Sequence, residues 1–186
     1  LNYAKKYLLK GLLQIEISAD QEAALEAEFL QICEALYESP QVICHRDFHS
    51  RNIMLTYGEV AIIDFQDARL GPPVYDLVSL FLDSYVNLSE NSVNELMQYY
   101  RDNFPYFRDL KLSDAQWYHL YLLQTIERCF KAFGSFASFK MTRDDNRYLD
   151  YIEPTLKIIL KQLPRWKPNS LLEKMILDSR TAWEAL

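Results

Sequence analysis

The sequence predicts a mainly α-helical fold with a small β-hairpin, an α+β class. Apolar residues recur at helical spacing before residue 40 and again after residue 74. Between these regions, the apolar segments "NIML" and "VAIIDF" flank the turn-like segment "TYGE". Hydrophobic residues make up 49% of the 186 residues, which is enough for one domain, or one large lobe, with its own core.

Helix boundaries are predicted from caps and breakers. The first helix covers residues 1–17, and Ser18-x-x-Gln21 is a capping box that opens the second, which ends before Pro40. A short buried strand, "VIC", follows at 42–44. Beyond "GPP" we expect helices over 74–86, 92–103, 113–139, 145–162 and 170–184, with capping boxes at Ser92-x-x-Glu95 and Ser113-x-x-Gln116. Pro154 predicts a late start or a kink in its helix.

Composition excludes several classes of function. The net charge of −6 argues against a nucleic-acid surface and against a polybasic membrane face. No apolar run reaches membrane-spanning length. Three scattered cysteines do not form a disulfide framework, so we expect a reducing, cytoplasmic location. The four glycines lie too far apart for a glycine-rich phosphate loop.

The hairpin predicts a metal site. Antiparallel partners have residue numbers with a constant sum, and centring the turn near Gly58 makes that sum 116. Asn52 would then face Asp64, and an amide oxygen beside a carboxylate suits Mg²⁺. Asp47 lies five residues before Asn52, in the loop that leads into the hairpin, and can reach the same space.

The spacing of these residues matches a phosphoryl-transfer pattern. His45-Arg46-Asp47, then four residues, then Asn52, followed later by Asp64-Phe65, is the catalytic-loop and metal-loop pair of kinases. Such a site needs one group to orient a hydroxyl and accept its proton, and others to hold metal against phosphate.

On these residues the chain resembles the aminoglycoside phosphotransferase family of the kinase-like superfamily. The segments that carry the resemblance are "HRDFHSRNIML" and "AIIDFQDARLGPPVYDLVSL", with "ERCFKAFGSF" further on. They are most similar to bacterial kinases that phosphorylate the anomeric hydroxyl of N-acetylmuramate or N-acetylglucosamine. The resemblance implies that residues 1–186 form the C-terminal, catalytic lobe of a protein-kinase-like fold. The nucleotide-binding lobe would precede Leu1, and the partners would be that lobe and a sugar or other alcohol acceptor.

The resemblance also implies roles for individual residues. Asp47 would be the catalytic base, while Asn52 and Asp64 would hold Mg²⁺ for ATP. His49 would lie near the transferred phosphate, and Asp76 would brace the catalytic loop. Gln66 departs from the protein-kinase pattern, which has glycine there, and the A-P-E motif is absent from the sequence. Both departures favour a small-molecule kinase.

Other residues keep two interpretations each. His45 is expected to bond the loop backbone rather than to act in catalysis. Arg51 and Arg128 are candidate contacts to the acceptor, with a solvated surface charge as the alternative. The phenylalanines at three-residue spacing, from Phe130 to Phe139, fit a core better than a sugar-stacking platform.

Three alternative functions remain open on the sequence alone. One is a kinase for an aminoglycoside or a choline-like alcohol. Another is a metallohydrolase that uses His45, Asp47 and His49 from one face of a strand. The third is a kinase-like binding module without turnover.

Overall fold

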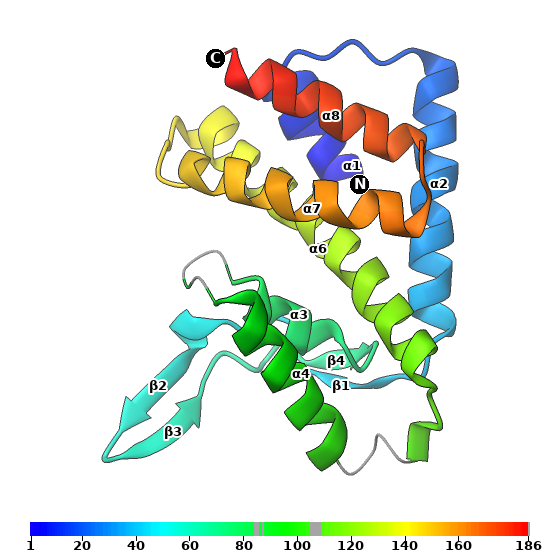
Figure 1. Ribbon diagram of the computed structural model, residues 1–186. Helices are drawn as coiled ribbons and strands as arrows, with labels where there is room; N and C mark the ends of the chain where they lie inside the picture. The colour runs from blue at the N-terminus through cyan, green and yellow to red at the C-terminus, as the bar shows by residue number, and fades with distance from the viewer. Residues whose placement is uncertain (84–85, 87, 105–108, 186) are drawn as a thin grey trace. The chain divides into compact units, whose positions relative to one another are not determined.

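The computed structural model describes residues 1–83, 86, 88–104 and 109–185. The chain divides into two compact units, Leu1–Glu34 with Thr125–Leu186, and Ala35–Gln124. In the described residues, helices predominate and the strands form small antiparallel pairs (Figure 1). The predicted class, mainly α with a small β part, is confirmed.

The first unit is helical. Its helices are α1 (Asn2–Ala4), the π-helix η1 (Lys5–Leu12), α2 (Ala19–Glu38), α6 (Asp114–Arg143), the 3₁₀ turn η3 (Leu149–Tyr151), α7 (Ile152–Trp166) and α8 (Leu171–Glu184), with the ends of α2 and α6 belonging to the second unit. The first helix was expected to end at residue 17 but ends at Leu12, and α6 was expected to end at residue 139 but continues to Arg143. The late start predicted at Pro154 is confirmed, because Pro154 occupies the first turn of α7, where the missing N–H costs no helical bond.

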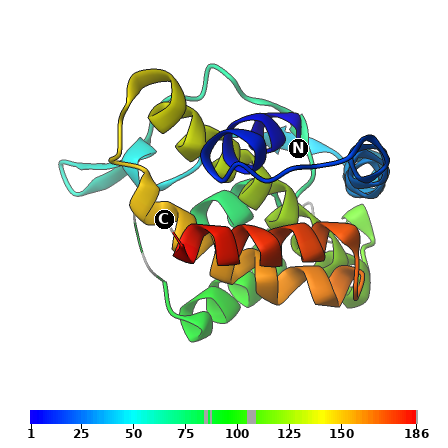
Figure 2. The same cartoon turned by 90° about the horizontal axis from the view of Figure 1, so that it is seen from above.

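Aromatic and aliphatic side chains fill the core of this unit. Phe130 packs edge-on against Phe29 and Phe133, with ring centroids 5.2 and 6.3 Å apart. Phe130, Phe133 and Phe136 are buried, which confirms the core interpretation for these three rings, while Phe139 is half-buried and stacks on Tyr148. Gly134 permits a close approach of α1, since a Cβ there would lie 2.7 Å from the Tyr3 ring. Helices α7 and α8 run side by side in opposite directions (Figure 2).

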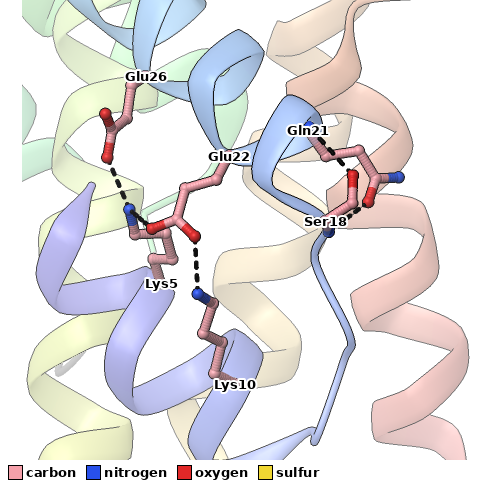
Figure 3. Close-up of polar contacts among 6 residues, drawn as sticks. All are labelled: Lys5, Lys10, Ser18, Gln21, Glu22 and Glu26. Carbon is pink, nitrogen blue, oxygen red and sulfur yellow. Dashed lines mark hydrogen bonds and ion pairs between the residues drawn. The ribbon is translucent and has the colours of Figure 1, made fainter.

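A charged cluster ties η1 to α2 (Figure 3). The Lys5 ammonium, on a side chain only 9% exposed, lies 2.5 Å from Glu22 and 2.7 Å from Glu26. Lys10 lies 2.8 Å from the second oxygen of Glu22. The hydrogen bonds from Lys10 and Lys5 lower the pKa of Glu22 to about 2. Its contribution to stability is therefore present above the ordinary glutamate pKa and is lost as pH falls toward 2.

The second unit contains the strands. They are β1 (Val42–Cys44), β2 (Ile53–Thr56), β3 (Glu59–Ile62) and β4 (Arg69–Gly71), with the 3₁₀ turn η2 (Ser50–Asn52) and helices α3 (Tyr75–Phe81) and α4 (Glu90–Asn103). Strands β2 and β3 form the expected hairpin, while β1 pairs with β4, which the sequence did not predict. Tyr57 and Gly58 both adopt positive φ, as a two-residue type I′ turn requires.

Capping explains where the helices begin. The Ser18 and Ser113 boxes form as predicted, with each serine hydroxyl and its glutamine bonding the other residue's backbone N–H. The capping box predicted at Ser92 is wrong. Ser89 is the N-cap of α4, its hydroxyl accepts the Ser92 N–H, and the helix begins at Glu90. Helix α3 ends at Phe81, short of the expected residue 86, and residues 84 and 85 lie outside the described residues.

None of the helices in the described ranges combines the length and apolar character that crossing a bilayer requires.

The N-terminus of α8 is capped from a distant helix. Glu28 of α2 accepts the N–H groups of Leu171 and Leu172 at 3.2 and 2.9 Å, and Lys167 lies 3.0 Å from it. The Glu28 side chain is 12% exposed, and its charge complements the helix dipole. One carboxylate thus joins residues more than 140 positions apart.

We predict that Glu28→Ala lowers the free energy of unfolding by about 1–3 kcal/mol, because two backbone N–H groups lose a charged acceptor. Urea unfolding measures this change. The matched control is Glu34→Ala, an exposed glutamate on the same helix, which should shift stability by less than about 0.5 kcal/mol. Equal stability of the two variants would contradict the assigned role of Glu28.

Candidate active site

The loop between β1 and β2 is held by one carboxylate. Asp76, in the first turn of α3, accepts the N–H of His45 at 2.6 Å and that of Arg46 at 2.9 Å. Arg46 adopts the left-handed conformation, with φ of 75°. Such a conformation costs about 1–3 kcal/mol in a non-glycine residue and persists only where surrounding contacts hold it. The two bonds to Asp76 are such contacts, and they are the bracing expected of this residue.

His45 links this loop to the base of the hairpin. Its Nε2–H donates to the carbonyl oxygen of Ile63 at 2.9 Å. The residue that follows Ile63 is Asp64, so the ring connects the loop to the predicted metal ligand. This is a structural role, as the sequence favoured for His45.

The metallohydrolase hypothesis loses its premise. It required His45, Asp47 and His49 to alternate along a strand, but β1 ends at Cys44 and the following residues form a loop. Within the described part of the chain, no group of three histidine, cysteine or acidic side chains is arranged to hold a metal.

Asn52 and Asp64 converge, although not by the expected register. Paired residues of β2 and β3 have residue numbers that add up to 115, so Asn52 lies opposite Ile63. The backbone carbonyl of Asn52 accepts the Ile63 N–H at 3.0 Å. Direct pairing of Asn52 with Asp64 is therefore wrong by one residue. Asp64 has a left-handed backbone with φ of 70°, and the Asn52 Nδ2 lies 3.4 Å from Asp64 Oδ2. The predicted convergence of the two side chains is confirmed.

The donor set at this point fits a hard cation. The Asn52 amide nitrogen also donates to the backbone carbonyl of Asp47 at 2.9 Å, which leaves Oδ1 to act as a metal ligand. Gln66 donates to the other Asp64 oxygen at 2.5 Å. One carboxylate and one amide oxygen are what Mg²⁺ takes from a protein when phosphates and water complete its shell. Asn52 and Asp64 are thus the residues that could hold Mg²⁺.

The remaining candidates, except Arg128, lie along the same loop. The backbone carbonyl of Asp47 accepts the N–H of His49, and the backbone carbonyl of His49 accepts the N–H of Asn52. Asp47, His49 and Asn52 are therefore connected by one short set of backbone turns. Arg51 is exposed on η2, next to Asn52. Arg128 belongs to the first unit, on α6, where its Nε is buried.

Cys44 is not a nucleophile. Burial raises the pKa of its thiol to about 12, with the charge of Asp76 adding to the effect. The thiol therefore stays protonated at neutral pH and packs against Gly71, where a Cβ would lie 3.1 Å from the sulfur. Burial likewise raises the pKa of the nearby Tyr100.

An apolar groove of about 680 Å³ adjoins the loop. It is lined mostly by hydrocarbon side chains from β1, α3 and α4, with His45 and Asp76 at its polar part. A sugar presents hydroxyl groups that need hydrogen-bond partners, so this groove does not suit a sugar acceptor.

Two residues at the site were missed by sequence reasoning. Gln66 was noted only as a departure from glycine, yet it bonds Asp64 directly. Asp83, seven residues after Asp76, accepts the Ser50 N–H at 2.7 Å. Asp83 lies two residues beyond the end of α3, and no sequence pattern pointed to this contact.

Comparison with known proteins places the site in a family. A model of the phosphotransferase enzyme family matches residues 2–110, which is more than half of the chain. The chain belongs to the phosphotransferase enzyme family. The resemblance read from the sequence is thereby confirmed.

Curated relatives of this phosphotransferase chain carry a more specific name. A Neisseria meningitidis protein named N-acetylmuramate/N-acetylglucosamine kinase is 30% identical over 145 residues, covering 77% of this chain and 43% of the relative. A Pseudomonas aeruginosa protein of the same name is 31% identical, covering 72% of this chain and 41% of the relative. The chain thus spans less than half the length of these relatives.

We predict that Asp76→Ala destabilises this phosphotransferase chain by about 1–3 kcal/mol for each backbone N–H that loses its partner. Urea unfolding gives the total, and amide hydrogen exchange at His45 and Arg46 locates the effect. Asp76→Asn keeps one acceptor oxygen and should lose less. Wild-type exchange rates in the alanine variant would show that Asp76 does not hold the loop.

Proposed function

We propose that the protein carrying this chain transfers the γ-phosphoryl group of ATP to a sugar hydroxyl. The observation that carries this proposal is the convergence of Asn52 and Asp64 beside the braced loop that contains Asp47. A base, an amide oxygen and a carboxylate in this order are the parts that phosphoryl transfer requires on the catalytic side.

The proposed reaction gives each residue one task. Asp47 orients the acceptor hydroxyl and takes its proton as the oxygen attacks the γ-phosphorus, while the bond to the bridging oxygen breaks and ADP leaves. Asn52 and Asp64 hold Mg²⁺, which when bound neutralises charge on the phosphates. His49 contacts the transferred phosphate. Arg51 is the candidate contact to the acceptor.

A sugar acceptor is supported by the names of the curated relatives, which are N-acetylmuramate/N-acetylglucosamine kinases. An amino sugar of the cell wall is therefore the proposed substrate class. A cytoplasmic location fits the three free cysteines and the need for ATP.

The second unit also exposes apolar pairs that a partner would cover. Ile43 and Leu70 pair across β1 and β4 and are 81% and 71% exposed. Leu55 and Val60 pair across the hairpin and are 77% and 68% exposed. Surfaces of this kind mark interaction sites. We propose that they pack against the nucleotide-binding lobe of the same protein.

In the protein that carries this chain, we predict that Asp47→Asn lowers kcat by about 10²–10⁴-fold, because the positioned base is lost. Binding of Mg-ATP should stay near wild type. Asp64→Ala should instead weaken Mg²⁺-dependent ATP binding. The measurement is a coupled ADP-release assay with N-acetylmuramate and N-acetylglucosamine, with kanamycin and choline as competing acceptor classes.

The control for this experiment is Asp67→Asn, which changes an exposed aspartate close in sequence to Asp64. It should retain wild-type turnover. Near-normal turnover in Asp47→Asn would move the base to another residue, with His49 the next candidate. Phosphorylation of kanamycin or choline in preference to both sugars would refute the proposed substrate class.

We predict that residues 1–186 alone fold but form no sugar phosphate at a measurable rate. A metal with two protein ligands relies on phosphates that other contacts fix, and the four glycines in this chain lie too far apart to make a phosphate loop. Circular dichroism, calorimetric ATP titration and the same assay test this. Turnover at ordinary kinase rates, about 1–100 s⁻¹, would show that the site is complete in this chain.

A further inference from the structure

We propose that Asp83 is a positioning residue that fixes Asn52 for metal binding by holding the backbone of Ser50. The inference rests on the proposed function, because it concerns the same metal site. It assigns a task to a carboxylate that neither the motif spacing nor the family resemblance includes.

The contact that carries the proposal is short and partly buried. Asp83 Oδ2 accepts the Ser50 N–H at 2.7 Å, and Asp83 is 7% exposed. Ser50 begins the 3₁₀ turn that ends at Asn52, and its carbonyl accepts the N–H of Ile53. Holding Ser50 therefore fixes the whole turn, including the direction in which the Asn52 side chain leaves it.

Asp83 and Asp76 together clamp the loop at two points. Asp76 holds His45 and Arg46 where the loop leaves β1, and Asp83 holds Ser50 just before the loop enters β2. Asp76 lies in the first turn of α3 and Asp83 lies just beyond its end, so one short helix carries both anchors of the loop. Asp47 lies between the two anchored points, while Asn52 lies just beyond the second.

The location of Asp83 is unfavourable for stability alone. It lies two residues beyond the last residue of α3, where the helix dipole disfavours a negative charge. A neutral side chain would avoid this penalty. A carboxylate is the acceptor that bonds a backbone N–H most strongly, so its presence there fits a positioning task.

The test compares Asp83→Leu, which removes the acceptor at similar size, with Asp83→Asn, which keeps an acceptor oxygen without the charge. Asp67→Leu serves as the control, because it changes an exposed aspartate of the same unit. Two quantities are measured by NMR on the 186-residue chain. One is amide hydrogen exchange at Ser50 and Asn52, and the other is the Mn²⁺ concentration that half-broadens the Asn52 side-chain amide signals.

We expect Asp83→Leu to accelerate exchange at Ser50 and Asn52, and to raise the required Mn²⁺ concentration by about tenfold or more, the usual effect of losing a group that orients a metal ligand. Asp83→Asn should restore most of both properties, and Asp67→Leu should change neither. A second line uses Ser50→Pro, which removes the N–H at the first position of the turn, where proline is tolerated. Its effect on Mn²⁺ binding should not add to that of Asp83→Leu.

Two outcomes would overturn the proposal. Unchanged exchange at Ser50 in Asp83→Leu would show that the contact does not hold the turn. Faster exchange with unchanged Mn²⁺ binding would make Asp83 a structural residue only. Paramagnetic broadening detects even weak, rapidly exchanging Mn²⁺, so its absence at Asn52 in the wild-type chain would refute the proposed metal site itself, and the exchange data separate that failure from loss of the Asp83 contact.

Discussion

The acceptance of two consecutive backbone N–H groups by the Asp76 carboxylate is the constraint on which the site depends. Those bonds hold Arg46 in a left-handed conformation that the chain would otherwise leave. With the backbone fixed there, the His45 ring reaches the Ile63 carbonyl and ties the loop to the hairpin. The separation of Asn52 and Asp64 follows from that tie, since Ile63 precedes Asp64 and pairs with Asn52.

The hairpin shows what motif spacing can predict and what it cannot. A hairpin centred near Gly58 predicted that Asn52 and Asp64 converge. The register was missed because both Tyr57 and Gly58 adopt positive φ, which moves the centre of the turn by half a residue. Tyrosine is not a residue that signals this turn type, which favours Asn-Gly or Asp-Gly. The left-handed backbone of Asp64 then turns its side chain toward Asn52 despite the shifted register, and no local sequence pattern predicts that conformation.

Contacts between residues close together in the sequence could be predicted, whereas contacts between distant residues could not. The Ser18 and Ser113 caps were predictable because each bond closes within three residues. The Ser92 cap failed because an equivalent serine three residues earlier takes the same role. Strand β4 has three residues and no periodicity, so only its pairing with β1 defines it. The hydrogen bond that the Leu172 N–H donates to Glu28 joins positions 144 apart, and motif spacing carries no information about contacts at such a sequence separation.

The two units use carboxylates for different purposes. In the first unit, Glu22 pairs with lysines, so its charge is balanced within the folded structure. In the second, Asp76 and Asp83 bond backbone N–H groups of the loop between β1 and β2. Asp47 has Arg46 and Arg51 beside it in the same loop, so carboxylates and guanidinium groups both surround the site. Asp76 and Asp83 therefore act on the backbone conformation of that loop, whereas Glu22 and its lysines join two helices through paired charges.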